Sequence, residues 1–257
     1  MAKVVSFYSY KGGSGRTVLL ANTAVMLAIR GHRVACIDYD LEAGGLHVVF
    51  GLPASELKYT VLHLLSTVAP PRINQVCQDL TTALVQRRND GALFLFPTFA
   101  EANRLARAIQ PDRNLDTVFE SIVNQIESDY KPDYVLVDTR AGFTEIASGP
   151  LLVNDALVVV ARPNKQNVEG LALFMDIMRL RRNPPQTVVV LNQVPDTRAA
   201  RPLVKAILHK LAKRSVSVSI PYDPDLAVDE HIISIKRPDS PLLVHYARLV
   251  KWIENLF

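Results

Sequence analysis

A glycine-rich stretch near the start of the chain combines residue types that bind phosphate. It reads KGGSGRT from Lys11 to Thr17 and stands between an apolar strand-like segment and a helix-like segment. Gly12, Gly13 and Gly15 let the backbone curl so that amide N–H groups point inward, and the helix adds the positive end of its dipole. The alternative is an ordinary tight turn, but the length and setting of the match predict a phosphate-binding loop.

Two side chains of this loop suit nucleotide chemistry. Arg16 supplies the charge that meets the β- and γ-phosphates, although it stands where such loops normally place a lysine. Arginine is a planar fork on a longer stem, so it is not equivalent to the point charge of lysine. Thr17 is placed where its hydroxyl can join a Mg²⁺ shell.

Carboxylates follow two apolar segments. Asp38 and Asp40 lie in CIDYDLEAGGLH, and Asp138 lies in DYVLVDTRAGFTE. The carboxyl ends of parallel strands are where doubly wound folds bind ligands. Asp138 therefore fits the role of an acid that holds Mg²⁺ through water, whereas a solvated pair at a strand end is the alternative for Asp38 and Asp40.

The elements that must position these residues alternate along the chain. Short apolar segments typical of buried strands cover 3–9, 32–38, 91–98, 133–139, 155–161 and 187–192. Amphipathic helical segments cover 17–31, 114–130, 167–182, 201–214 and 241–257. The pattern predicts an α/β fold with a single doubly wound, mostly parallel sheet flanked by helices on both faces. We expect one domain over 1–257, and residues 40–115 are the hardest to assign.

Composition narrows the class of protein. Of the 257 residues, 49% are hydrophobic, which predicts a sizeable core. Only Cys36 and Cys77 are present, without the spacing of metal ligands, and we expect both to be reduced. The start is too short and polar for a signal peptide, and we expect a cytoplasmic protein. The net charge of +4 is compatible with DNA or an anionic membrane surface without requiring either.

The loop resembles the deviant Walker A motif K-G-G-x-G-K-[ST] of the ParA/MinD superfamily of P-loop ATPases, with Arg16 replacing the second lysine. It looks closest to the bacterial subgroup that carries K-G-G-x-G-R-T. The resemblance implies a homodimer with ATP at its centre, in which Lys11 crosses the interface to the nucleotide of the partner subunit. A solvated surface lysine is the alternative for Lys11.

The same resemblance implies roles for the acids. Asp40 positions the attacking water as part of switch I, and Asp38 supports the metal and the loop. This sequence has Leu41-Glu42 where the family has Pro-Gln. Gly142 and its neighbours resemble switch II. Arg140 stands where plasmid-partition ATPases usually have proline, and contact with phosphate, pairing with an acid of the switch and simple exposure remain open for it.

The resemblance also supplies the full set of candidate site residues, with ATP and Mg²⁺ as cofactors. Asn192 resembles the asparagine that reads the adenine edge, and the SIPYDPDLAV segment resembles the I-P-x-D segment beside the base. The expected catalytic residues are Lys11, Arg16 and Asp40. The expected metal residues are Thr17, Asp38 and Asp138. The expected nucleotide-binding residues are Gly12, Gly13, Ser14, Gly15, Arg16, Thr17, Val18, Asn192, Pro221, Tyr222 and Asp223.

Two helical segments bear on the partners. Segment 201–214 carries a basic face that could grip DNA phosphates without sequence preference, or could simply be solvated; its residues are Arg201, Lys205, Lys210, Lys213 and Arg214. Segment 241–257 is amphipathic but has little firm positive charge, so we expect it to pack on the sheet and not to anchor the chain to a membrane.

Three functions fit these features. The first is an ATP-hydrolysing dimerisation switch that is slow, stimulated by a partner, and positions a cargo or adaptor on nonspecific DNA, with association with the nucleoid. The second is a regulatory ATPase module that controls a protein partner in bacterial signalling or defence. The third is a protein kinase, because bacterial tyrosine kinases share the loop type, but the end WIENLF has no tyrosine cluster.

Overall fold

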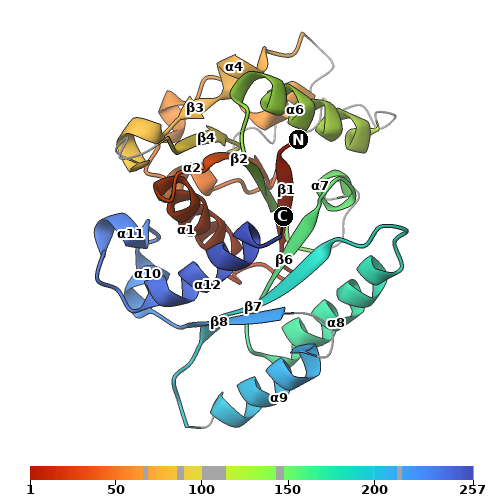
Figure 1. Ribbon diagram of the computed structural model, residues 1–257, viewed down its shortest axis with the longest axis vertical. Coiled ribbons are helices and arrows are strands. Elements are labelled where there is room, and N and C mark those ends of the chain that lie inside the picture. The colour runs from red at the N-terminus through yellow and green to blue at the C-terminus, as the bar shows by residue number, and fades with distance from the viewer. Residues whose placement is uncertain are drawn as a thin grey trace.

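One eight-stranded sheet runs through the molecule (Figure 1). The computed structural model describes residues 1–65, 69–85, 90–99, 114–142, 148–198, 200–212 and 216–256. The strands are β1 (Lys3–Tyr8), β2 (Arg33–Tyr39), β3 (Gln78–Asp79), β4 (Ala92–Phe96), β5 (Tyr134–Thr139), β6 (Ala156–Ala161), β7 (Gln186–Val194) and β8 (Val216–Pro221). Their order is β3-β4-β2-β5-β1-β6-β7-β8, and only the pairing of β3 with β4 is antiparallel among the described residues.

The strand sequences explain why the sheet is parallel and covered on both sides. Apolar residues make up most of β1, β2, β4, β5 and β6, and almost every residue of these strands is buried. Side chains of successive strand residues point to opposite faces, so such continuous apolar runs need a hydrophobic layer on each face. The predicted α/β, doubly wound and mostly parallel fold is confirmed.

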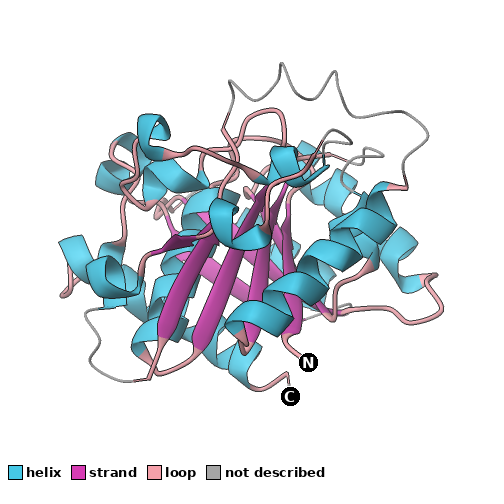
Figure 2. Ribbon diagram, turned by 90° about the horizontal axis from the view of Figure 1, so that it is seen from above, coloured by secondary structure: helices cyan, strands magenta, loops and turns pink. Residues whose placement is uncertain are grey.

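Helices form these two layers, as Figure 2 shows from above the sheet. The helices are α1 (Arg16–Ile29), α2 (Leu46–Val49), α3 (Val61–Leu65), α4 (Ile73–Val76), α6 (Leu115–Tyr130), α7 (Ser148–Leu152), α8 (Lys165–Arg179), α9 (Ala200–Ala212), α10 (Pro224–Val228), α11 (Ile233–Lys236) and α12 (Leu242–Glu254). Side chains of α1 and α12 share one apolar cluster with one face of the sheet. Those of α3, α6 and α8 pack on the other face.

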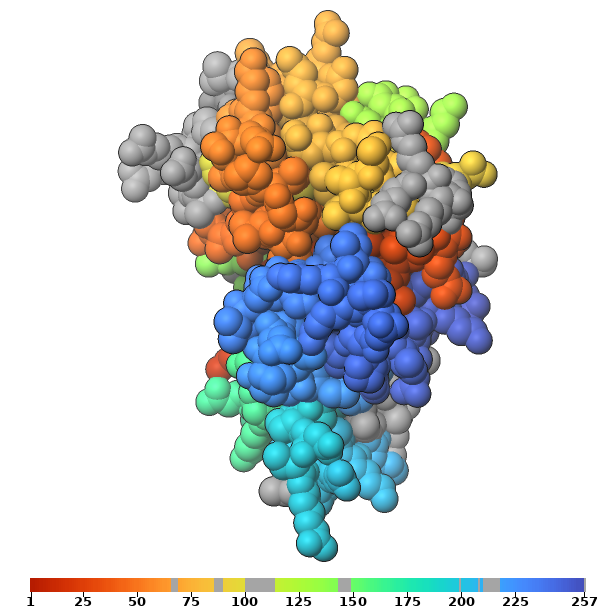
Figure 3. Space-filling model, turned by 90° about the vertical axis from the view of Figure 1, so that its left-hand side faces the viewer, coloured from red at the N-terminus to blue at the C-terminus, as the bar shows by residue number. Residues whose placement is uncertain are grey.

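The C-terminal helix α12 packs its apolar face against the rest of the molecule, as the sequence predicts. Its apolar stripe is buried against α1 and β8; the buried residues are Leu242, Tyr246, Leu249, Val250 and Ile253. In Figure 3 the α10–α12 region, in blue, forms the middle of the face toward the viewer. In the described part of the chain, no helix combines the length and apolarity that crossing a membrane requires.

The strand order brings the acidic and glycine-rich segments together. β5 lies between β1 and β2, and in register Asp138 faces Phe7 on one side and Asp38 on the other. The loop that follows β1 and the acids that end β2 and β5 therefore meet at the carboxyl edge of the sheet, which is the usual ligand edge of such folds. Segment 40–115, which resisted assignment from sequence, contains β3, α2–α4, a 3₁₀ turn at Ala54–Glu56 and a π turn at Thr81–Val85.

Candidate functional site

The glycine-rich loop adopts the curled conformation that its sequence predicts. Gly13 has φ of 72° and Gly15 has φ of 76°, both in the left-handed region that favours glycine. Gly15 is also the N-cap of α1, so the helix begins at Arg16 with its first amides directed to the loop. The loop is therefore an open cradle of backbone donors for an anion.

Asn192 holds the glycine-rich loop through a hydrogen bond to its backbone. It lies on β7, is buried, and its Nδ2 donates to the carbonyl oxygen of Ser14 at 2.9 Å. A Cβ atom added to Gly15 would lie 2.6 Å from that nitrogen, so only glycine fits there. The side chain predicted to read the base thus also supports the phosphate cradle.

Asp38 is fully buried and its carboxylate organises the segment after β2. Its Oδ1 accepts from the backbone N–H of Asp40 at 3.3 Å, and its Oδ2 accepts from that of Leu46 at 3.0 Å. Burial and the neighbouring Asp138 raise the pKa of Asp38 well above its ordinary value, although these two hydrogen bonds lower it. Asp38, a predicted metal residue, therefore uses both of its carboxylate oxygens to hold the segment after β2.

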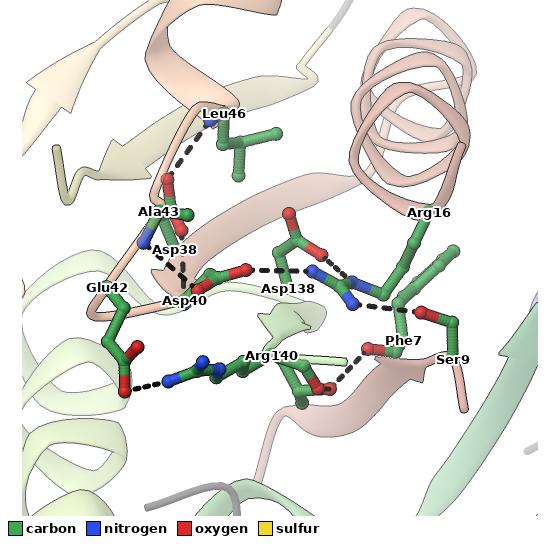
Figure 4. A network of polar contacts seen from close by, with 11 residues as sticks. Phe7, Ser9, Arg16, Asp38, Asp40, Glu42, Ala43, Leu46, Asp138 and Arg140 are labelled. Atoms are coloured by element: carbon green, nitrogen blue, oxygen red, sulfur yellow. Dashed lines mark hydrogen bonds and ion pairs between the residues drawn. The ribbon is translucent and has the colours of Figure 1, made fainter. Parts of the chain in front are cut away.

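Arg16 is the centre of the polar network at the end of the sheet (Figure 4). Its side chain is only 7% exposed. Nε donates to Asp138 Oδ1 at 2.5 Å, Nη1 to Ser9 Oγ at 3.0 Å, and Nη2 to Asp40 Oδ2 at 3.3 Å. Burial alone would lower the pKa of Arg16, but the carboxylates, Asp138 above all, raise it, so the guanidinium stays charged.

A second ion pair joins the same two segments. Glu42, two residues after Asp40, pairs with Arg140, two residues after Asp138 (Figure 4). Of the three alternatives for Arg140, this contact corresponds to pairing with an acid, here one in the segment that follows Asp40. Asp40 Oδ1 also accepts from the N–H of Ala43 at 3.2 Å, which closes a local turn.

Lys11, at the front of the loop, is exposed and rests on α8. Its Nζ donates to Gln166 Oε1 at 2.7 Å. One turn further along the same helix, Gly170 lies under the ring of Tyr10, and an added Cβ would come within 2.2 Å of that ring. The first residues of the loop are therefore docked on α8.

A pocket of about 220 Å³ extends from the loop toward β7 and β8. It brings together several predicted residues, namely Gly13, Gly15, Val18, Asn192, Pro221 and Asp223. Further lining residues that sequence reasoning missed include Arg162, Gln193 and Glu230. Arg162 directly follows β6, so the strand-end rule that found Asp138 could also have found it. A more open hollow of about 830 Å³ lies near Lys3, at the amino ends of the strands and away from the loop.

Two predicted base-side residues have other contacts. Tyr222 is half exposed, and its backbone N–H donates to Val194 O at 2.9 Å. Asp223 caps α10 by accepting from the N–H of Leu226 at 2.8 Å, and its other oxygen accepts from Arg237 at 3.0 Å. Burial would raise the pKa of Asp223, but these hydrogen bonds lower it below its ordinary value. Asp223 therefore shapes the wall of the pocket.

The site suits a metal ion that arrives with a nucleotide. No group of three or more His, Cys, Asp or Glu side chains that could hold a metal by itself occurs among the described residues. However, Asp138 Oδ2 and Ser14 Oγ are buried and have no hydrogen-bond partner there. Thr17 lies half-buried on the first turn of α1. Mg²⁺ prefers few protein ligands plus phosphate oxygens and water, so these residues fit it.

The basic face of α9 is described only in part. Arg201 and Lys205 are exposed, and Arg201 pairs with Asp196 at 3.0 Å. Only the backbone of Lys210 is described, and Lys213 and Arg214 lie outside the described residues, as do the neighbours of Gly142 from 143 to 147.

Comparisons with known proteins show which family and fold the chain shares. A sequence model of the family described as "AAA domain" matches residues 2–187. The septum site-determining protein MinD of Bacillus subtilis is 27% identical over 191 residues, which cover 74% of this chain and 65% of that protein.

Solved structures share the fold. MinD of Pyrococcus horikoshii, complexed with Mg-ADP, superposes with a TM-score of 0.78 at 20% identity and covers 100% of this chain and 97% of that chain. A putative plasmid partition protein of Borrelia burgdorferi, bound to AMPPNP, gives a TM-score of 0.77 at 18% identity, over 100% of this chain and 99% of that chain.

Proposed function

This chain belongs to the AAA domain family, within the ParA/MinD superfamily of P-loop ATPases, and on that premise we propose that it is an ATP-driven dimerisation switch. The observation that carries the proposal is the left-handed pair Gly13 and Gly15 at the start of α1, placed beside three carboxylates. That arrangement offers amide donors to phosphate and acidic groups to a metal in one place.

In this proposal the triphosphate lies against the loop amides from Gly12 to Val18, and Arg16 meets the β- and γ-phosphates. The base enters the 220 Å³ pocket between Asn192 and Pro221. Because Asn192 also holds the loop through Ser14, recognition of the base and the shape of the phosphate cradle depend on one side chain.

Mg²⁺, when bound, would neutralise phosphate charge. Thr17 would hold it through its hydroxyl, and Asp138 would contact its water shell through Oδ2, which has no partner among the described residues. Asp38 keeps the segment after β2 in place through Asp40 and Leu46. Asp40 orients the attacking water. Hydrolysis is slow until a partner binds, as the resemblance to the ParA/MinD superfamily implies.

The γ-phosphate also controls assembly. Lys11 leaves Gln166, reaches the nucleotide held by a second copy, and so closes a homodimer. On phosphate the Lys11 ammonium meets an opposite charge, whereas the amide oxygen of Gln166 that it leaves is uncharged. The dimer therefore depends on a triphosphate, and hydrolysis opens it.

Two kinds of partner, DNA and a protein, are candidates for the surface that binds the cargo. The exposed Arg201 and Lys205 on α9 support nonspecific contact with DNA phosphates. A protein partner is the second candidate, and the outward side of α8 favours it, because Leu173, Ile177 and Leu180 are exposed at helical spacing around its end. Either partner can act as the stimulator of hydrolysis.

Sedimentation velocity separates these options. The chain is run with Mg-ADP, with Mg-ATP, and with Mg-ATP plus a DNA duplex of unrelated sequence at low and high salt. We expect a monomer with ADP, a dimer with ATP, and salt-sensitive cosedimentation with DNA only with ATP. An ATP dimer that ignores DNA would favour the protein partner. A monomer under all conditions would contradict the switch.

A further inference from the structure

The guanidinium of Arg16 is already engaged with the chain itself. Three of its N–H groups donate to Asp138, Ser9 and Asp40, and the side chain is buried. In Figure 4 the group points into the carboxylates at the ends of β2 and β5. An arginine holds five N–H groups in one plane, so it can join several acceptors at once, which the single nitrogen of lysine does less well.

Arg16 has two alternative sets of partners, the carboxylates of Asp138 and Asp40 or the phosphates of a nucleotide. In the proposed nucleotide complex Arg16 meets the β- and γ-phosphates at the loop amides, and we infer that it gives up Asp138 and Asp40 to do so. If Arg16 left, the cluster of Asp38, Asp40 and Asp138 would lose its cation. Asp38 and Asp138 are fully buried. An unpaired buried charge is strongly unfavourable, so Arg16 leaves only if another positive charge arrives.

The structure also shows where that charge is received. Asp138 uses Oδ1 for Arg16, while Oδ2 is buried and has no partner among the described residues. The same carboxylate can therefore begin to contact a metal shell before it releases the guanidinium. Asp40 has no comparable substitute, since its other oxygen is held by Ala43. It is set free when Arg16 turns away.

We propose that Arg16 is the internal counter-cation of the ligand-free site and gives up Asp40 and Asp138 only when phosphates and Mg²⁺ enter together. The inference rests on the proposed nucleotide site and adds its regulation. Nucleotide binding is therefore weaker without the metal, and Asp40 becomes available for water only when the phosphates hold Arg16. The arginine thus couples occupancy of the loop to release of the residue that works on the water.

Calorimetric titration with AMPPNP, with Mg²⁺ or with EDTA, tests this coupling through affinity. Asp40→Asn removes the negative charge from one acceptor of Arg16, so Mg²⁺-free binding should tighten about tenfold. In the Arg16→Lys background the same substitution should change affinity by less than about twofold, because lysine bridges the two acids poorly. A matched control, Glu42→Gln, removes an acid from the same segment that pairs with Arg140 and should leave affinity within about twofold.

If Asp40→Asn changed the AMPPNP affinity by the same factor in the wild-type and in the Arg16→Lys background, Asp40 would merely repel phosphate. That result would overturn the proposal. Weaker binding by Asp40→Asn would overturn it as well. The double-mutant comparison is what isolates the contact between Arg16 and Asp40 from simple charge removal.

A second measurement needs no nucleotide. In the free protein the Arg16 Nε–H should give an NMR signal protected from solvent exchange, absent in Arg16→Lys and shifted in Asp138→Asn. Addition of Mg-AMPPNP should shift it again, while AMPPNP with EDTA should not. If the free chain shows no protected signal, the counter-cation role fails. If the signal is present but AMPPNP never binds, the nucleotide function fails and the proposed coupling to it is overturned too, while the ligand-free contact stands.

Discussion

Alanine substitution at the three loop glycines gives a graded test of the cradle. Gly12 has no positive φ and an added Cβ meets nothing within 4 Å, so Gly12→Ala should change the free energy of unfolding by no more than about 0.5 kcal/mol. Gly13 also has open space but a φ of 72°, so Gly13→Ala should cost about 1–2 kcal/mol of left-handed strain.

Gly15→Ala combines this strain with a collision. Its φ is 76°, and the new Cβ would lie 2.6 Å from Asn192 Nδ2. Asn192 must move and lose its bond to Ser14 O, which is worth about 1 kcal/mol, so the total cost should be about 2–3 kcal/mol. Denaturation by urea without nucleotide, with unchanged m-values, measures the series. Equal costs at Gly12 and Gly15 would refute the loop geometry and the role of Asn192.

Four other substitutions test the site. Arg16→Ala should abolish nucleotide binding in calorimetry and lower the free energy of unfolding by about 3 kcal/mol, because buried carboxylates lose their cation; retained micromolar affinity would contradict it. Lys11→Ala should weaken the ATP-dependent dimer more than monomer binding, and equal dimer fractions by sedimentation would speak against its transfer to the partner. Asp40→Ala should trap an ATP dimer, an idea that fails if phosphate release is unchanged. Asp223→Asn should flatten the acid dependence of thermal stability: the folded pKa of Asp223 lies below 3.8, so its pairing with Arg237 stabilises the chain above that pH and is lost as the pH falls through the folded pKa. Parallel melting curves for both proteins would rule this out.

Sequence reasoning reached the parts of the molecule that local patterns determine. The apolar runs identified the parallel strands except β8, and the stripe of Leu242, Tyr246 and Leu249 identified a packed C-terminal helix. The acids after two strands converge because parallel strands end at the same edge of the sheet.

What sequence reasoning did not reach depends on contacts between distant residues. The pairing of Arg16 with Asp138 spans 122 positions, and nothing in either motif predicts that the guanidinium faces the acids in the ligand-free chain. For Arg140 the sequence left three alternatives open, one of them pairing with an acid of the switch, and it did not identify Glu42 as that acid. The two-residue strand β3 and the short helices α2–α4 contain too few residues for a periodic signal.

A crystal structure of the chain with AMPPNP and Mg²⁺ tests the proposed nucleotide site directly. We expect the phosphates to lie against the amides of residues 12–18, with Arg16 turned from Asp138 to the β- and γ-phosphates and the base beside Asn192. An empty loop at saturating nucleotide, or a nucleotide bound elsewhere, would contradict it.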